Sequence, residues 1–328
     1  MNKKQAAFIL AKIAFAAIVL ALLFHKVDAA AVWGYVRNAS LAPILVGTLF
    51  CWFTVLIASV RWHRLLRAFE IRIPLFALVC IAQIGQFFLM FLPGPVGDDL
   101  TRMLYISRLS KGRIAEACAS VLLDRCIGLA SILLLAVACI SSQWASLAMS
   151  AKTRLPAACI FAAGMVVLAG VILYFSVDGL FMQRTVEGIL NRLPAFKIRG
   201  ELTLISKRIF TSKLAVAQVL FAAIGTQMLL CAVYYFAGKS VGIPGSIAIW
   251  LGFVPIVLAA NAVPITVFGL GVRESILVLY LGVLGHVDGG EALAASFIVL
   301  SMTLAVCLLG GIVYIFYRPA AGDHASPA

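Results

Sequence analysis

The chain has 328 residues and a net charge of +13, yet 63% of its residues are hydrophobic and only 12% are charged. No soluble fold tolerates so much apolar surface, and several charge-free stretches reach the roughly 20 residues that a helix needs to span a ~30 Å hydrocarbon layer. The basic residues flank these stretches, where they orient a membrane protein and attract anionic lipids, so nucleic acid is not an expected partner. We predict an all-α integral membrane domain over residues 1–318 and a disordered tail over 319–328.

Metal sites and other cofactors are not expected. The eight cysteines lie singly in apolar runs, and the four histidines lie in separate loops. No Cys-x-x-Cys or Cys/His pairing occurs, so neither zinc nor a disulfide framework is predicted. The ATP-binding pattern Gly-x-x-x-x-Gly-Lys-Ser/Thr is also missing from the sequence.

The order of charges along the first half indicates where the chain crosses the membrane. Helices are expected over residues 8–24 and 41–60, the first being retained rather than removed as a signal peptide. A basic cluster follows over 61–72, and a second basic stretch covers 177–213. Short loops rich in Lys and Arg stay in the cytoplasm. Both basic stretches are therefore expected on the cytoplasmic side.

Three apolar segments separate the two basic stretches. They cover residues 75–92, 115–140 and 156–176. Three full crossings cannot return the chain to the side that it left, so one segment is expected to enter the membrane and turn back. The break follows the first segment, where Pro93, Gly94 and Gly97 precede a short charged helix over about 99–109. Breaks of this kind build the substrate sites of many membrane transporters.

The second half of the chain, over about 156–317, repeats the plan of the first half, over about 8–140. Its elements are the helix over 156–176, a helix over 214–237, a segment over 246–263, a short helix over 275–285 and a last helix over 292–317. Its break contains Pro264, Gly269 and Gly271. Each half holds three full crossings, so the second half is inverted relative to the first. We predict six full spans with two opposed re-entrant hairpins and cytoplasmic termini; eight full spans are the alternative.

Seven charged residues inside the expected membrane segments form the candidate substrate-binding site. They are Arg102, Arg125, Arg273, Asp98, Asp99, Asp124 and Glu274, with a formal sum of −1. Each charge in a spanning helix costs about 2.5–3.5 kcal/mol on insertion scales, so each needs a partner. Asp98 or Asp99 is expected to cap the short helix, and Asp98 to pair with Arg102, four residues further on.

Asp124 and Arg125 are neighbours on one helix and need partners on other elements, because successive helical residues point about 100° apart. We expect Asp124 to pair with Arg102 or Arg273, and Arg125 to pair with an acid of either break. The arginines are expected to meet an anionic head group near the start of a short helix. The alternative is that Asp124 and Arg125 only lock the two hairpins together. Gln83, Gln86 and Asn261 either line the same cavity or, as we favour, form interhelical hydrogen bonds.

Three motifs, in their order and spacing, resemble those of the lysylphosphatidylglycerol synthase transmembrane-region family. They read Pro93-Gly94-x-x-Gly97-Asp98…Arg102, Leu122-Leu123-Asp124-Arg125 and Gly269-x-Gly271-x-Arg273-Glu274. The resemblance covers about 8–317 and implies a lipid flippase-like fold, as in the flippase half of bacterial proteins that make and translocate aminoacylated phosphatidylglycerol. Family members often have Glu-Arg in the middle motif and Gly-Gly at the start of the last, where this chain has Asp124-Arg125 and Phe268-Gly269.

The synthases also carry a large soluble domain that uses aminoacyl-tRNA, and 328 residues leave no room for it. We therefore expect a stand-alone member that does not make the lysyl lipid. The expected function is movement of an anionic or polyprenyl-phosphate-type lipid between the leaflets of a bacterial inner membrane, without enzymatic activity. The alternatives are a membrane glycosyl- or phosphoryl-transferase, with a metal held by Asp98 and Asp99, and an accessory subunit of lipid or envelope synthesis. Membrane lipid is the expected partner, and a second copy of the chain or lipid-synthesis enzymes are further candidates.

Overall fold

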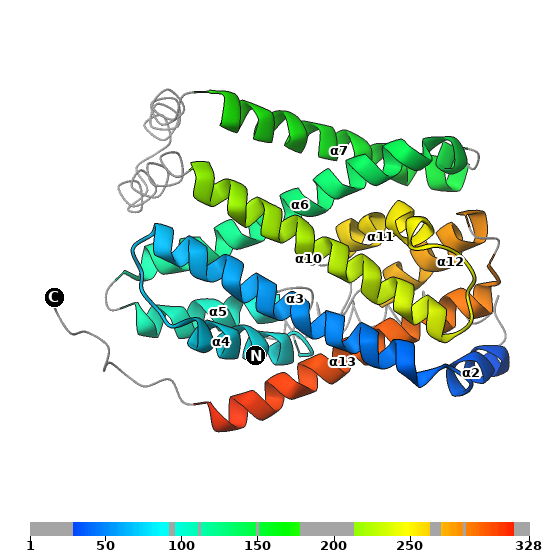
Figure 1. The fold of residues 1–328 in the computed structure, drawn as a ribbon, viewed down its shortest axis with the longest axis horizontal. Coiled ribbons are helices and arrows are strands. Elements are labelled where there is room, and N and C mark those ends of the chain that lie inside the picture. Colours follow the sequence, from blue (N-terminus) through cyan, green and yellow to red (C-terminus); the bar gives the residue numbers. More distant parts are fainter. Residues whose placement is uncertain are drawn as a thin grey trace, which may run out of the picture.

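The computed structural model describes residues 29–91, 96–110, 113–148, 151–177, 213–262, 270–284 and 287–317. Over these residues the chain forms ten helices and no strand (Figure 1). The prediction of an all-α fold is therefore confirmed. The expected first helix over 8–24, nearly all of the basic stretch over 177–213 and the tail over 319–328 lie outside the described residues.

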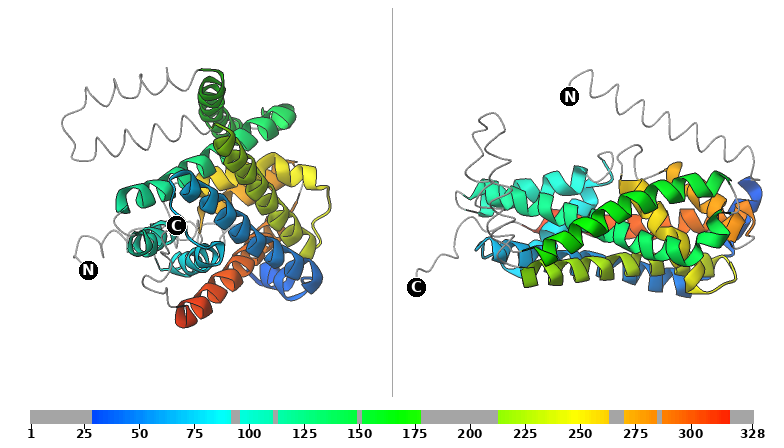
Figure 2. Two further views of the ribbon diagram at one scale, coloured as in Figure 1. Left: turned by 60° about the vertical axis from the view of Figure 1, so that its left-hand side comes forward. Right: turned by 90° about the horizontal axis from the view of Figure 1, so that it is seen from above.

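Five long helices form the body of the molecule. They are α3 (Leu41–Ala68), α6 (Ile114–Ala148), α7 (Ala151–Ser176), α10 (Lys213–Ser240) and α13 (Gly289–Phe316). Each contains an apolar stretch long enough to cross a membrane, and they run roughly along the long axis of the bundle (Figures 1 and 2). The chain is thus a multi-pass α-helical membrane protein, and these helices coincide with five of the expected spans.

Two pairs of shorter helices pack against the long ones. The first pair is α4 (Leu75–Phe88) with α5 (Val96–Leu109), and the second is α11 (Ile247–Ala262) with α12 (Val272–Leu284). The two members of each pair are in contact, and α13 contacts both α4 and α12. In Figure 1, α4 and α5 lie in the left half of the bundle, whereas α11 and α12 lie in the right half. A further short helix, α2 (Ala29–Arg37), packs on α13.

Helix α3 is longer than the sequence indicated. We expected it to end at residue 60 and the basic cluster over 61–72 to form a loop, and this boundary is wrong. The helix continues to Ala68, since no proline or glycine interrupts it there. It ends with a left-handed residue, Glu70, whose φ is 57°. As a result, Arg61 and Trp62 are buried inside the bundle instead of facing the cytoplasm.

Two other helices also begin or end away from their expected limits. Helix α5 begins at Val96, so Asp98 and Asp99 lie within its first turn rather than at its cap, where carboxylates still favour the helix dipole. Helix α6 continues past residue 140, with a non-helical backbone at Gln143 (φ −119°, ψ 17°). The Gln143 side chain donates its Nε2 to the Ala248 carbonyl at 2.8 Å. This bond links the kink in α6 to the start of α11.

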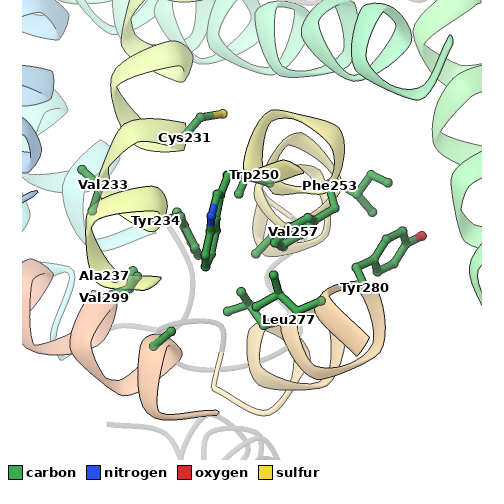
Figure 3. Close-up of a cluster of buried hydrophobic side chains, with 14 of the residues drawn as sticks. Cys231, Val233, Tyr234, Ala237, Trp250, Phe253, Val257, Leu277, Tyr280 and Val299 are labelled. Atoms are coloured by element: carbon green, nitrogen blue, oxygen red, sulfur yellow. The ribbon is translucent and has the colours of Figure 1, made fainter. Parts of the chain in front are cut away.

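The largest apolar core lies where α10 meets the second short pair. Figure 3 shows Tyr234 of α10 near Trp250 and Phe253 of α11, with Leu277 and Tyr280 of α12 on the other side. The rings of Trp250 and Phe253 lie 5.6 Å apart, and those of Phe253 and Tyr280 lie 6.2 Å apart. Close packing of this kind resists displacement. It therefore holds α11 and α12 in fixed positions relative to α10.

Candidate functional site

A cavity of about 370 Å³ lies inside the bundle and is lined by both short helix pairs together with α3, α6, α10 and α13. Its charged lining residues are Arg61, Asp98, Asp99, Arg102, Asp124, Arg125 and Arg273. Other parts of the wall are apolar and include Leu129, Ile132, Leu230 and Val233. A cavity with a charged region and an apolar region suits an amphipathic ligand.

Asp124 of α6 joins two arginines that come from different helices. Arg61 of α3 donates Nε to Oδ1 at 2.6 Å and Nη2 to Oδ2 at 2.9 Å, which is the bidentate arrangement that arginine favours. Arg102 of α5 reaches Oδ2 at 3.4 Å and donates Nε to Asp98 at 2.8 Å. We call these four buried residues the Asp124 network. The predicted contacts of Arg102 with Asp98 and Asp124 are confirmed, and the network ties α3, α5 and α6 together.

Trp62 supports the Asp124 network from its apolar side. The indole is fully buried and donates Nε1 to the hydroxyl of Ser120 at 3.0 Å. The guanidinium carbon of Arg102 lies 5.4 Å from the centre of the ring, which is within the range of a cation–π interaction. Arg102 is therefore held by two carboxylates and an aromatic face.

A separate ion pair, Arg125 with Asp99, lies in a more open part of the cavity. Arg125 of α6 donates Nε to Asp99 of α5 at 3.2 Å. The two side chains are 34% and 25% exposed, against 12% or less in the Asp124 network. The Nη2 atom of Arg125 is shielded and has no hydrogen-bond partner among the described residues. The predicted pairing of Arg125 with an acid near a break is confirmed.

A third charged group forms at the start of α12. Glu274 accepts hydrogen bonds from Arg273 Nη2 at 2.6 Å, from the Ser296 hydroxyl at 2.8 Å and from the Gly271 amide at 2.6 Å. Gly271 has a φ of 87°, a conformation that a residue with a side chain rarely adopts. Arg273 lines the cavity, whereas Glu274 is fully buried behind it.

These three groups together are electrically neutral. Four arginines (Arg61, Arg102, Arg125 and Arg273) face four acids (Asp98, Asp99, Asp124 and Glu274), with contacts between 2.6 and 3.4 Å. The sum of −1 expected from the sequence omitted Arg61, which we had assigned to the cytoplasmic cluster. Pairing of this kind offsets the cost of placing charges inside a membrane domain.

The model of a known family matches almost the whole chain. This family is described as the lysylphosphatidylglycerol synthase TM region, and the match covers residues 9–311. The chain belongs to this family. All charged residues of the three groups lie within the matched range, and the membership predicted from the three motifs is confirmed. No curated protein matches the chain in sequence.

In this member of the lysylphosphatidylglycerol synthase TM-region family, every predicted site residue except Glu274 lines the cavity. Gln86 and Asn261 also line it, whereas Gln83 donates to the Val306 carbonyl at 2.6 Å, as an interhelical hydrogen bond. Among the predicted breaks, four residues lie outside the described part of the chain: Pro93, Gly94, Pro264 and Gly269. Gly97 is described, and a Cβ there would overlap the Phe88 carbonyl, so glycine permits the close approach of α4 and α5.

The partner of Asp124 was only half predicted. Of the two arginines that we considered, Arg102 contacts it and Arg273 does not, because Arg273 donates to Glu274 and Ser296 instead. Its shortest contact is with Arg61, which sequence reasoning missed.

A signal for Arg61 was present in the sequence. Arg61 and Leu65 lie four residues apart on one face of α3, and both are buried. Helical periodicity carried past residue 60 would have turned Arg61 towards the interior. The contribution of α10, including Thr226 and Gln227, was also missed, since single polar residues in an apolar helix give no such signal.

Proposed function

We propose that this protein moves a lipid with an anionic or polyprenyl-phosphate-type head group between the leaflets of a bacterial inner membrane. The observation that carries the proposal is the internal cavity, in which ion-paired arginines lie beside apolar walls. Membership of the lysylphosphatidylglycerol synthase TM-region family supports a lipid-related function. Arginine binds phosphate through paired, charge-assisted hydrogen bonds, so a phosphate can replace a carboxylate on the same guanidinium.

Three polar atoms of cavity-lining residues have no hydrogen-bond partner among the described residues, which favours a polar ligand in the cavity. Arg125 Nη2, Gln227 Oε1 and Asn261 Oδ1 are shielded and have no hydrogen-bond partner among the described residues, and all three residues line the cavity. Buried polar groups are nearly always hydrogen-bonded in folded proteins. A polar ligand in the cavity would satisfy them once their side chains turn towards it.

The carboxylates of Asp98 and Asp99, which a metal-dependent transferase would need as ligands, are paired with arginines instead. Asp98 accepts from Arg102, and Asp99 accepts from Arg125. This pairing favours lipid transport over a metal-dependent transferase. The sequence has no ATP-binding pattern, so we propose that movement is downhill or coupled to an ion gradient.

We further propose that the short helix pairs are re-entrant hairpins that enter from opposite faces and form an inverted repeat. Helices α4, α5, α11 and α12 have 14, 14, 16 and 13 residues. At 1.5 Å per residue they are about 20 to 24 Å long, which is less than the ~30 Å hydrocarbon layer. The arrangement has six spans with cytoplasmic termini, and it places the cavity where the hairpins meet.

Cysteine labelling tests the hairpins. The eight native cysteines are first replaced. Phe91, which follows α4 at the turn of the first hairpin and is 62% exposed, is then changed to cysteine. A membrane-impermeant maleimide added from the periplasm is expected to leave Phe91→Cys unmodified while it labels Arg37→Cys in α2. Labelling of both positions would support eight full spans and refute the first hairpin.

Reconstituted lipid movement tests the cavity. Gly128 lines the cavity, and a Cβ there has only Arg61 Nη2 within 4 Å, at 3.9 Å, so the side chain of Gly128→Leu starts in open space beside Arg61 and is expected to occupy the cavity. Gly225 in α10 does not line the cavity and has nothing within 4 Å, so Gly225→Leu is the matched control. Proteoliposomes containing fluorescent phosphatidylglycerol are expected to exchange lipid between leaflets with the wild type and the control, but not with Gly128→Leu. Equal exchange by all three proteins, or exchange no faster than in protein-free vesicles, would contradict the proposal; the second result would favour an accessory subunit.

A further inference from the structure

We propose that Arg125 is the residue that first binds the anionic head group, and that the Asp99 carboxylate is the group that the head group displaces. This inference rests on the proposed function and names the residues that exchange partners during it. The other arginines of the cavity keep their carboxylate partners while the lipid binds.

The geometry separates Arg125 from the other arginines. Its pair with Asp99 has a single hydrogen bond of 3.2 Å between partly exposed side chains. Pairs of this exposure contribute little to stability and separate readily. Arg61 and Arg102 instead share the buried Asp124, and Arg273 is 3% exposed with two contacts to Glu274. Opening any of those pairs would leave a buried charge without a partner, which is much more costly.

Arg125 also has an unused donor. Nε is bonded to Asp99, whereas the shielded Nη2 has no acceptor among the described residues. A phosphate that takes Nε from the carboxylate also gains that donor, once the Arg125 side chain turns and exposes it. The fork of arginine matches two phosphate oxygens, so the head group makes two bonds where Asp99 makes one.

The proposed exchange predicts whether a mutation of Asp99 raises or lowers the affinity for the lipid. Because Asp99 competes with the head group for Arg125, the neutral variant Asp99→Asn is expected to bind an anionic lipid more tightly, by about fivefold for a pair of this exposure. Arg125→Gln is expected to weaken binding of the same lipid. If the pair of Arg125 and Asp99 only held α5 against α6, Asp99→Asn would instead weaken lipid binding, because it would loosen the site.

The chain offers a matched control pair outside the cavity. Arg113 donates to Glu116 at 3.0 Å, and these side chains are 33% and 22% exposed, close to the values for Arg125 and Asp99. Neither residue lines the cavity. Glu116→Gln and Arg113→Gln therefore remove an ion pair of similar exposure without touching the site.

The test is titration of the full chain in detergent with dioctanoyl phosphatidylglycerol, read by native mass spectrometry. Dioctanoyl phosphatidylcholine and inorganic phosphate are titrated in parallel. We expect Asp99→Asn to tighten phosphatidylglycerol binding, Arg125→Gln to weaken it, and both control variants to match the wild type. Unchanged or weaker binding by Asp99→Asn would overturn the proposal, and Asp99→Ser repeats the test if the first variant does not fold. Binding of inorganic phosphate as tight as that of phosphatidylglycerol would overturn the assignment of the site to a lipid head group.

Failure of this inference can be told apart from failure of the proposed function. If Gly128→Leu stops lipid exchange while Asp99→Asn does not tighten binding, the cavity is the route and Arg125 is not the first contact. If Gly128→Leu exchanges lipid as fast as the wild type, the cavity itself is not the route.

Discussion

Loss of the Asp124 carboxylate is expected to destabilise the fold through the two arginines that it leaves behind. Asp124 accepts hydrogen bonds at 2.6 and 2.9 Å from Arg61 and at 3.4 Å from Arg102, and the side chains of all three are at most 8% exposed. Removing one partner of a buried ion pair costs about 3–5 kcal/mol. In Asp124→Asn, Arg102 keeps Asp98, whereas Arg61 loses its full charge partner. We therefore expect the unfolding free energy to fall by about 3 kcal/mol.

The double variant separates the ion pair from the simple loss of a side chain. Arg61→Gln with Asp124→Asn removes both buried charges, so its cost is expected to be smaller than the sum of the two single costs. Residues in one hydrogen-bond network show coupling energies of about 0.5–3 kcal/mol, and the bidentate geometry places this pair in the upper half of that range. Arg64→Gln is the control on the same helix: Arg64 is exposed, bonds Gln218 at 2.9 Å and is expected to change stability by less than about 0.5 kcal/mol.

The assay is reversible unfolding of the purified protein in mixed micelles by titration with sodium dodecyl sulfate, followed by circular dichroism. The reasoning would be refuted if Asp124→Asn were no more destabilising than Arg64→Gln. It would also be refuted if the double variant cost as much as the sum of its parts, because Arg61 and Asp124 would then be independent.

Two further variants test the other buried contacts by the same unfolding assay. Glu274→Gln removes a fully buried carboxylate that accepts from three groups, and it is expected to lower the unfolding free energy by about 3–5 kcal/mol. Glu116→Gln, in a partly exposed pair, is expected to lower it by less than about 1 kcal/mol, and equal losses in the two variants would contradict the role of burial. Gly310→Ala is expected to destabilise the contact of α13 with α4, because the new methyl group would overlap the Gln83 carbonyl. Gly225→Ala is the control: its methyl group meets open space, and it is expected to stabilise α10 by up to about 1 kcal/mol. If Gly310→Ala left the stability unchanged, α13 and α4 would not be in close contact.

Much of the order of the helices could be predicted from the sequence, because spanning helices must be long and apolar and a charge inside them is costly. Five expected spans coincide with long helices, and the two short pairs lie on either side of Pro/Gly breaks. The pair of Asp98 with Arg102 was predicted from helical spacing. For Arg125, the need of each intramembrane charge for a partner predicted an acid of either break, and the structure shows that this acid is Asp99.

The sequence did not predict Arg61, for a physical reason. Arginine beside a basic cluster at the end of an apolar run is ordinarily a cytoplasmic anchor, and we gave this pattern more weight than the lack of a helix-breaking residue between Arg61 and Ala68. Its partner Asp124 is 63 residues away, and their contact depends on how α3 crosses α6. Crossing angles follow from side-chain packing over whole helix faces, which local patterns do not encode. The neutral charge of the site was missed for the same reason.

In the proposed function, a lipid head group enters the cavity that the two short helix pairs line together. The most direct measurement is photocrosslinking in proteoliposomes with phosphatidylglycerol that carries a diazirine in its head group, followed by mass spectrometry of the labelled peptides. We predict adducts on the cavity walls of α5, α6 and α10, at residues such as Arg125, Leu129 and Gln227, and their loss in Gly128→Leu. Adducts confined to the ends of the long helices, and unchanged in Gly128→Leu, would contradict the account.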